Sequence, residues 1–244
     1  MTTPRIRQVS CLSIVTLFIC LTFLGCKKDQ STGRVKTQIG PDIPAVDFDL
    51  DKIRERGSLI AVVDNSTTGY FIYRGKPIGY EYELLTRLAN YLKVELEVQI
   101  TADIQGAFNM LNSGKADIMA YHLAVTKERS ERFAFTEPHN NVPQVLVQRK
   151  PENWRQLKLH EIEETLIRNP IDLGGKTVYV RKGSSFADRL NNLSDEIGDD
   201  INIIEMEGAV DTEMLIRDVL DGKIEFTVAD EDIALINETY YPSL

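Results

Sequence analysis

The feature of this sequence that most restricts its fold is an alternation of strand-like and helix-like segments. Residues 59–63 form a short continuous apolar run, typical of a strand buried on both faces of a sheet. Apolar residues then follow with helical spacing over 82–92, strict alternation over 94–100 and helical spacing over 104–111, and 117–120 (Asp-Ile-Met-Ala) is expected to be another buried strand. This β-α-β-α-β order predicts a mostly parallel sheet with helices packed against it.

The second half of the chain has the same order of elements without a close repeat of the residues. The sequence therefore predicts two α/β units, and its length allows each unit a core of its own. An extended apolar segment is expected to lead the chain out of the first unit. The segments of the second half are an extended run at 142–148, a helical stretch at 160–167, strands at 177–180, 201–204 and 226–229, and helices at 185–193, 212–220 and 231–237.

The N-terminal segment has the pattern of an export signal. Arg5 and Arg7 give it a positive start, and an apolar stretch follows over 11–24. This stretch has the length of a signal-peptide core and is shorter than the roughly 20 residues needed to span a bilayer. We therefore expect residues 1–25 to be a signal peptide, with an uncleaved anchor as the alternative.

A lipid attachment site is expected directly after the signal peptide. Residues 23–26 (Phe-Leu-Gly-Cys) resemble a bacterial lipobox, although Phe23 stands where leucine is usual. The cysteine of a lipobox is acylated, which predicts a lipid on Cys26 and attachment to a membrane through it. The polar, glycine- and proline-containing stretch that follows lacks apolar periodicity, so we expect a flexible tether over 26–51.

Charge, cysteines and histidines exclude several classes of function. The 244 residues carry a formal net charge of −9 without a basic cluster, so nucleic acid is not an expected partner. All three cysteines lie at or before position 26, which leaves the folded part without thiolate chemistry or cysteine metal ligands. The three histidines are scattered without ligand spacing. We expect no metal, no cofactor and no catalytic residue.

Several short motifs follow one another between residues 52 and 237. They are Gly-Tyr-Glu-Tyr-Glu-Leu at 79–84, Gly-Lys-Ala-Asp at 114–117, Thr-Lys-Glu-Arg with Phe-Ala-Phe-Thr-Glu-Pro at 126–138, Asp-Leu-Gly-Gly-Lys-Thr-Val with Gly-Ser-Ser at 172–185, and Asp-Gly-Lys with Asp at 221–230. Together, in this order, they resemble the family 3 solute-binding proteins, the receptors for polar amino acids in bacterial uptake. The resemblance implies the two-lobed type II periplasmic binding protein fold, an α/β fold that traps ligand between its lobes.

The resemblance also implies how the chain is divided. Lobe 1 is expected over 52–143, lobe 2 over 144–233, and the start of a return to lobe 1 over 234–244. A complete fold of this family ends with further strand and helix in the first lobe, so a C-terminally truncated type II fold is expected. The hinge is expected near 142–148.

A ligand site with opposite charges is implied by the same resemblance. Arg129, Thr126 and either Ser184 or Ser185 would hold the carboxylate of an amino acid, and Asp230 would hold its ammonium. Elementary chemistry agrees, because a guanidinium donates two parallel hydrogen bonds to a carboxylate and a helix start favours an anion.

Each of these residues also has a simpler interpretation. The alternative for Arg129 is a solvated residue beside a helix cap, and the alternative for Asp230 and the two serines is a helix cap itself. Tyr70 or Phe71, after the first strand, would cover the ligand side chain, or else lie in the core or at the rim. Residues 121–124 (Tyr-His-Leu-Ala) are bulkier than those of typical amino-acid receptors and would fill part of a conventional pocket, which predicts a smaller ligand, an altered site or a site without function.

Two functions remain open at this point. The first is a receptor that delivers an amino acid or short peptide to an ABC permease. The second follows from residues 79–84 and 88–92, which look like the binding domain of the membrane-bound lytic transglycosylase F family. In that family this domain regulates a lysozyme-like domain that cleaves peptidoglycan, and such a domain would lie beyond Leu244. Either function predicts a monomeric, lipid-anchored, non-enzymatic domain on the periplasmic side of a bacterial envelope.

Overall fold

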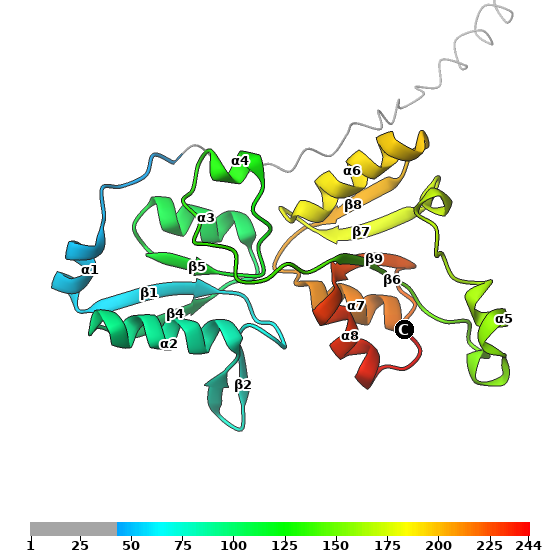
Figure 1. Ribbon diagram of the computed structural model, residues 1–244, viewed down its shortest axis with the longest axis horizontal. Helices are drawn as coiled ribbons and strands as arrows, with labels where there is room; N and C mark the ends of the chain where they lie inside the picture. Colours follow the sequence, from blue (N-terminus) through cyan, green and yellow to red (C-terminus); the bar gives the residue numbers. More distant parts are fainter. Residues whose placement is uncertain (1–42) are drawn as a thin grey trace, which may run out of the picture. The chain divides into compact units, whose positions relative to one another are not determined.

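Helices and strands alternate along the part of the chain that the computed structural model describes, residues 43–244 (Figure 1). The predicted signal peptide, the lipidation of Cys26 and most of the predicted tether lie outside the described residues. The strands are β1 Ser58–Val63, β2 Phe71–Tyr73, β3 Lys76–Ile78, β4 Glu95–Ile100, β5 Ile118–Ala120, β6 Gln144–Val147, β7 Thr177–Arg181, β8 Asn202–Met206 and β9 Phe226–Asp230. The helices are α1 Leu50–Arg56, α2 Tyr80–Leu92, α3 Ile104–Asn112, α4 Lys127–Ser130, α5 Leu159–Glu163, α6 Ser185–Ile197, α7 Thr212–Leu220, α8 Glu231–Tyr240 and the 3-10 turns η1 Trp154–Gln156 and η2 Pro170–Leu173.

The first sheet has three parallel strands in the order β4-β1-β5. Helices α2 and α3 cover its opposite faces (Figure 1). Ala61 and Val63 of β1 pack in one cluster with Leu85 of α2, whereas Val62 packs with Phe108 of α3. Successive side chains of a strand point to opposite faces, so burial on both sides explains why β1 is a continuous apolar run.

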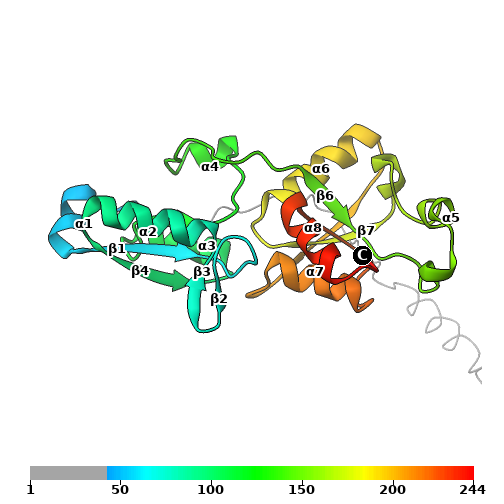
Figure 2. The same cartoon turned by 60° about the horizontal axis from the view of Figure 1, so that its bottom comes forward.

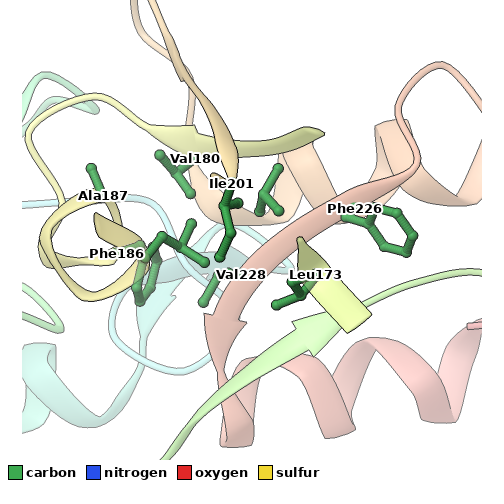
Figure 3. Packing of buried hydrophobic residues seen from close by; sticks show 9 residues of the cluster. Leu173, Val180, Phe186, Ala187, Ile201, Phe226 and Val228 are labelled. Carbon is green, nitrogen blue, oxygen red and sulfur yellow. The ribbon is translucent and has the colours of Figure 1, made fainter. Parts of the chain in front are cut away.

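The second sheet has the order β6-β9-β7-β8, with β7, β8 and β9 parallel and β6 antiparallel to β9. Phe186 of α6 packs with Val180 and Val228 on one face (Figure 3). Ile216 of α7 packs with Ala229 and with α8 on the other. Each sheet is therefore the centre of its own three-layer core, as the alternating pattern predicted.

Two local features differ from what the sequence predicted. A hairpin, β2–β3, leaves the first sheet after β1 (Figure 2), and its turn places Arg74 and Gly75 at positive φ, 49° and 78°. In addition, residues within the predicted tether over 26–51 make contacts with the folded part of the chain. The N–H of Val46 donates to the carbonyl of Asn112, and the Asn112 amide donates to the carbonyl of Ile43, so the last part of the predicted tether is bound to the end of α3.

Within residues 43–244, no helix combines the length and the apolar character needed to cross a lipid bilayer.

Candidate functional site

The carboxyl ends of the parallel strands bring charged and polar residues together in each sheet. Asp64 follows β1, Ala102 lies just past β4, and Tyr121 follows β5, while Arg181 ends β7 and Asp230 ends β9. Parallel strands end at one common edge, and ligands of α/β proteins bind beyond that edge. The topology therefore assembles one group of candidate residues on each sheet.

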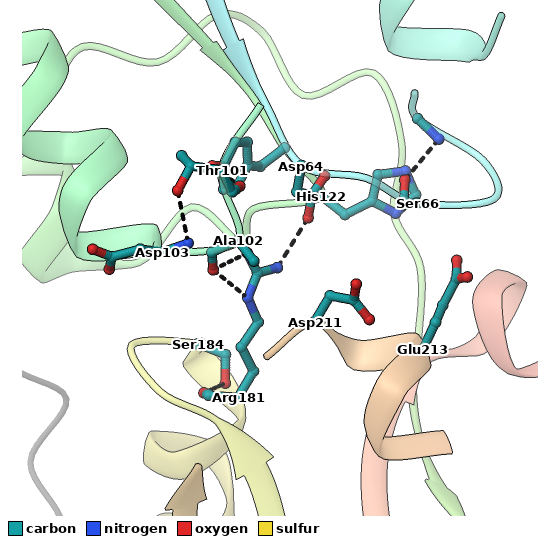
Figure 4. Close-up of polar contacts among 12 residues, drawn as sticks. Asp64, Ser66, Thr101, Ala102, Asp103, His122, Arg181, Ser184, Asp211 and Glu213 are labelled. Carbon is teal, nitrogen blue, oxygen red and sulfur yellow. Dashed lines mark hydrogen bonds and ion pairs between the residues drawn. The ribbon is translucent and has the colours of Figure 1, made fainter. Parts of the chain in front are cut away.

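Arg181 joins these two groups by crossing from the second sheet to the first (Figure 4). Its Nη1 donates to Asp64 Oδ2 at 2.9 Å, and its Nε and Nη2 donate to the Ala102 carbonyl at 3.2 and 2.6 Å. Arg181 is 7% exposed and Asp64 is 8% exposed. The guanidinium carbon also lies 5.6 Å from the centre of the Tyr121 ring. The result is a buried ion pair between residues 117 positions apart, which the sequence analysis did not predict.

Arg129 crosses in the opposite direction. Its backbone N–H donates to the Oγ1 of Thr126, which caps the start of α4. Its Nη1 donates to the Ala124 carbonyl at 2.8 Å, and its Nη2 donates to the Gly183 carbonyl, beyond β7, at 2.9 Å. The side chain is buried, with 2% exposed, and this desolvation lowers the pKa of the guanidinium. Arg129 is therefore not a solvated surface residue.

Ser184 and Ser185 lie at the start of α6, directly after the loop that accepts from Arg129. The Ser184 hydroxyl donates to the Arg181 carbonyl at 2.7 Å, and the Ser185 hydroxyl accepts from the Gln144 amide at 3.4 Å. The N–H of Gly183 in this loop donates to a carboxylate oxygen of Glu205 at 3.1 Å. The loop thus holds a carboxylate of the chain itself, which agrees with the preference of such loops for anions.

Asp230 lies at the N-cap position of α8, but its side chain makes no capping hydrogen bond. Burial raises the pKa of this carboxyl to about 6, and the nearby carboxylates Asp232 and Asp64 add to the increase while His122 opposes it. The groups that influence Asp230 come from both sheets. Among residues 43–244, Asp230 and Arg129 form no hydrogen bond or ion pair with each other.

Two further contacts join the ends of the two sheets. The N–H of Thr67, in the loop after β1, donates to the Glu213 carboxylate of α7 at 2.6 Å. The Nδ1 of His122, after β5, lies 3.8 Å from the Asp232 carboxylate at the start of α8. Its Nε2 is 3.4 Å from the hydroxyl of Thr68. His122, Glu213 and Asp232 were not selected from the sequence, because each is a polar residue in a loop or first helical turn.

Tyr70, one of the two candidates for covering the ligand side chain, lies in the core of the first sheet. Tyr70 is 7% exposed and packs with Leu85, and its ring meets the edge of Tyr82 at a centroid distance of 5.7 Å. Phe71 begins the hairpin strand β2. Core packing therefore accounts for Tyr70 without a ligand. The bulk of Tyr121 also has an internal partner, because its hydroxyl donates to the Thr101 carbonyl at 2.6 Å.

Residues 59–207 match the family of bacterial extracellular solute-binding proteins, family 3. The chain belongs to this family. Among its curated relatives is a membrane-bound lytic murein transglycosylase F of Desulfosudis oleivorans, 33% identical over 195 residues, or 80% of this chain and 40% of that protein. Another is transglycosylase F 1 of Alkalilimnicola ehrlichii, 32% identical over 199 residues, or 80% of this chain and 37% of that protein. The chain thus spans less than half the length of these relatives.

Solved structures of the same fold include holo ArgBP from T. maritima. Its TM-score is 0.65 at 24% identity, over 79% of this chain and 77% of that one. The substrate-binding protein AbpA from Streptococcus pneumoniae bound to L-arginine has a TM-score of 0.62 at 22% identity, over 79% of this chain and 76% of that one. The likeness confirms the predicted two-lobed α/β fold of the type II periplasmic binding proteins.

Proposed function

We propose that this family 3 domain captures an amino acid or a short wall-derived peptide between two lobes. One observation carries the proposal. The guanidinium of Arg129 is buried, two of its N–H donors reach backbone carbonyls, and no carboxylate of residues 43–244 forms an ion pair with it, although Asp188 and Glu128 act on its charge from a greater distance. A buried cation without an anion is costly. A ligand carboxylate would supply the missing negative charge through charge-assisted hydrogen bonds.

The remaining roles follow from the chemistry of an amino acid. Thr126 fixes the backbone of Arg129, and Ser184 or Ser185 would add a hydroxyl to the carboxylate from the start of α6. Asp230 would accept from the ligand ammonium. Its pKa is raised because the effect of burial exceeds the opposing effect of His122, and an ammonium placed there would favour the ionised form. The role of Phe71 as a cover for the ligand side chain stays a prediction.

The proposed mechanism is closure of the lobe over 52–143 on the lobe over 144–233, about a hinge near 142–148. A ligand drives such a closure only as far as it binds the closed form more tightly than the open form. A carboxylate that contacts Arg129 from one lobe and the α6 start from the other would bind the closed form more tightly. In the open form, a ligand carboxylate would reach the donors of only one lobe.

A second candidate function is the regulation of a murein-cleaving enzyme. Its support is the name that the curated relatives share, membrane-bound lytic murein transglycosylase F. In this proposal the ligand is a wall peptide, the catalytic domain lies beyond this chain, and the protein is held at the bacterial envelope by a lipid on Cys26. The first candidate instead pairs the domain with a permease.

The experiment is a thermal-shift screen of the full chain against L-amino acids and short wall peptides. We expect at least one ligand to raise the melting temperature by several degrees, about 3–6 °C at about ten times its dissociation constant. Arg129→Ala should abolish the shift. Arg168→Ala is the matched control, because Arg168 is exposed and paired with Glu163. A well-folded chain that responds to nothing in the panel would overturn the proposal, and a response to wall peptides alone would favour the second candidate.

A further inference from the structure

The guanidinium of Arg181 is held by the set of groups that recognise a free guanidinium ligand. Asp64 supplies a carboxylate, Ala102 supplies a carbonyl that accepts two N–H groups, and Tyr121 supplies an aromatic ring. Carboxylates pair with guanidinium through charge-assisted hydrogen bonds, and aromatic rings attract it through their π-electrons. Asp64 and Ala102 lie in loops that follow strands of the first sheet, whereas Arg181 comes from the second (Figure 4). Tyr121 likewise follows strand β5 of the first sheet.

A side chain tethered to the protein is difficult for a soluble ligand to displace. Its binding is intramolecular, and tethering through a short segment corresponds to an effective concentration of about the millimolar range. Arg181 is anchored at the end of β7 and is almost fully buried, so its guanidinium stays beside Asp64. A ligand with a guanidinium or ammonium side chain would need the same carboxylate and would find it occupied.

Both buried arginines therefore determine which ligands can bind beyond the carboxyl ends of the parallel strands. Arg129 offers donors to an anion, and Arg181 removes the Asp64 carboxylate from use by a cation. We propose that Arg181 is a specificity-determining residue, which occupies the cation position of the ligand site with its own guanidinium and so excludes ligands with a cationic side chain. This inference rests on the proposed function in assuming that the site binds a ligand. That the guanidinium of Arg181 occupies the position beside Asp64 follows from its contacts alone.

The test replaces Arg181 by alanine and offers the vacated position a free guanidinium. The probes are methylguanidine and L-arginine, added to the full chain while its melting temperature is measured. For Arg181→Ala we expect a rise of about 3–6 °C at about ten times the dissociation constant, and for the unchanged chain no rise from methylguanidine. Arg189→Ala is the matched control, because Arg189 pairs with Glu196 at 3.0 Å on the exposed side of α6 and its loss opens no such position.

The double variant Arg181→Ala with Asp64→Ala distinguishes the outcomes. It lacks both charges, so it should fold without the ion pair and should not respond to methylguanidine. If Arg181→Ala alone is recovered unfolded, refolding by methylguanidine supports the proposal, and failure to refold while the double variant is folded overturns it. A folded Arg181→Ala that ignores both probes also overturns it.

These results are separate from those of the ligand screen. If methylguanidine stabilises Arg181→Ala and no ligand stabilises the unchanged chain, the Arg181 inference is supported and the proposed function is contradicted. A natural ligand for the unchanged chain, together with an unresponsive Arg181→Ala, would do the reverse. An unchanged chain that binds L-arginine as tightly as any neutral amino acid would also contradict the role of Arg181.

Discussion

Two buried arginines connect the ends of the two sheets, and they differ in the partner that each one reaches. Arg181 leaves the end of β7 and binds the Asp64 carboxylate on the first sheet. Arg129 leaves the segment after β5 and binds the Gly183 carbonyl beyond the second sheet. Both are at most 7% exposed. One cross-sheet contact is thus an ion pair, and the other is a single hydrogen bond from a charged group to a neutral carbonyl.

This difference is the reason why the proposed function assigns ligand binding to Arg129 and not to Arg181. The Arg181 guanidinium has its counter-charge within the chain, so it needs no ligand and blocks one. The hydrogen-bond partners of the Arg129 guanidinium in the described part of the chain are carbonyls, and burial lowers its pKa because the charged form is poorly solvated, an effect that the more distant Asp188 and Glu128 oppose. An added carboxylate would relieve the cost at Arg129 and would have nothing to gain at Arg181. In the proposed site, the lack of an ion pair rather than burial therefore distinguishes Arg129 from Arg181.

The largest expected effect comes from breaking the ion pair at Asp64. Asp64→Ala leaves the Arg181 guanidinium buried without a counter-charge, and loss of one partner of a buried pair costs about 3–5 kcal/mol of unfolding free energy. Urea unfolding of the full chain measures this. Asp64→Ala with Arg181→Ala should recover most of the loss, because no lone charge remains. A single variant within about 1 kcal/mol of the unchanged chain would contradict the buried pair.

The next effect tests the other arginine, and it concerns affinity more than stability. Arg129→Ala should weaken the best ligand of the screen by about 1.5–3 kcal/mol, or roughly 10- to 150-fold, because a charge-assisted contact to the carboxylate is lost. Its stability loss should be smaller than that of Asp64→Ala, since the remaining carbonyls are neutral. Titration calorimetry and urea unfolding measure the two quantities. Arg129→Lys keeps the charge without the fork and should restore only part of the affinity.

If Arg129→Ala instead costs as much stability as Asp64→Ala and leaves affinity unchanged, the two arginines have exchanged roles. Arg181 would then be the residue to examine for ligand contact.

Asp230 gives a smaller effect, which depends on pH. Burial raises its pKa to about 6, so the folded state holds this proton more tightly than the unfolded state, whose carboxyl has the ordinary value of 3.8. The stability from this group is therefore present below about pH 4 and is lost as the pH rises through about 6. At pH 7, Asp230→Asn should unfold with a free energy up to about 2 kcal/mol higher than that of the unchanged chain. Urea unfolding at several pH values measures the difference.

The effect of Asp230 on ligand affinity should depend on pH in the opposite sense to its effect on stability. A ligand ammonium favours ionised Asp230, so affinity for an amino acid should rise between about pH 5 and pH 7 in the unchanged chain. In Asp230→Asn the affinity should be weaker and nearly constant over this range. A parallel pH dependence in the two proteins would remove Asp230 from the ammonium position.

Much of the fold could be predicted from the sequence because local pattern and burial agree there. The apolar run of β1 and the helical spacing of α2, α3 and α7 match the elements of the structure within a few residues. The hairpin β2–β3 was missed for local reasons. Its turn uses Arg74 at positive φ where asparagine or glycine is usual, and Pro77 lies within β3, where proline argues against a strand.

The candidate site was only half predictable. Motif order pointed to Arg129, and the structure places it in a buried cross-sheet contact. Arg181 and Asp64 carried a weaker signal, because a charged residue after an apolar strand usually reads as solvated. Their common property is the position directly at the carboxyl end of a parallel strand, which is where ligands of α/β folds bind. Sequence could reveal that position, but the pairing of two such residues arises only when the sheets meet.

The smallest expected effect comes from Thr126, the N-cap of α4, and tests whether this cap positions Arg129 for a ligand. Thr126→Ala removes the hydroxyl that accepts the Arg129 N–H, which should cost about 1 kcal/mol of stability and, by loosening the arginine, about fivefold in affinity. Asp49→Ala is the matched control. Asp49 caps α1, which leads into the amino end of β1, away from the edge that carries Arg129. Its loss should cost similar stability and leave affinity unchanged. Equal losses of affinity in the two variants, measured by calorimetry, would mean that Arg129 is positioned by the stability of the whole domain. A loss confined to Thr126→Ala would place that control in the single turn of α4, which is consistent with an arginine poised for a ligand rather than locked by an ion pair.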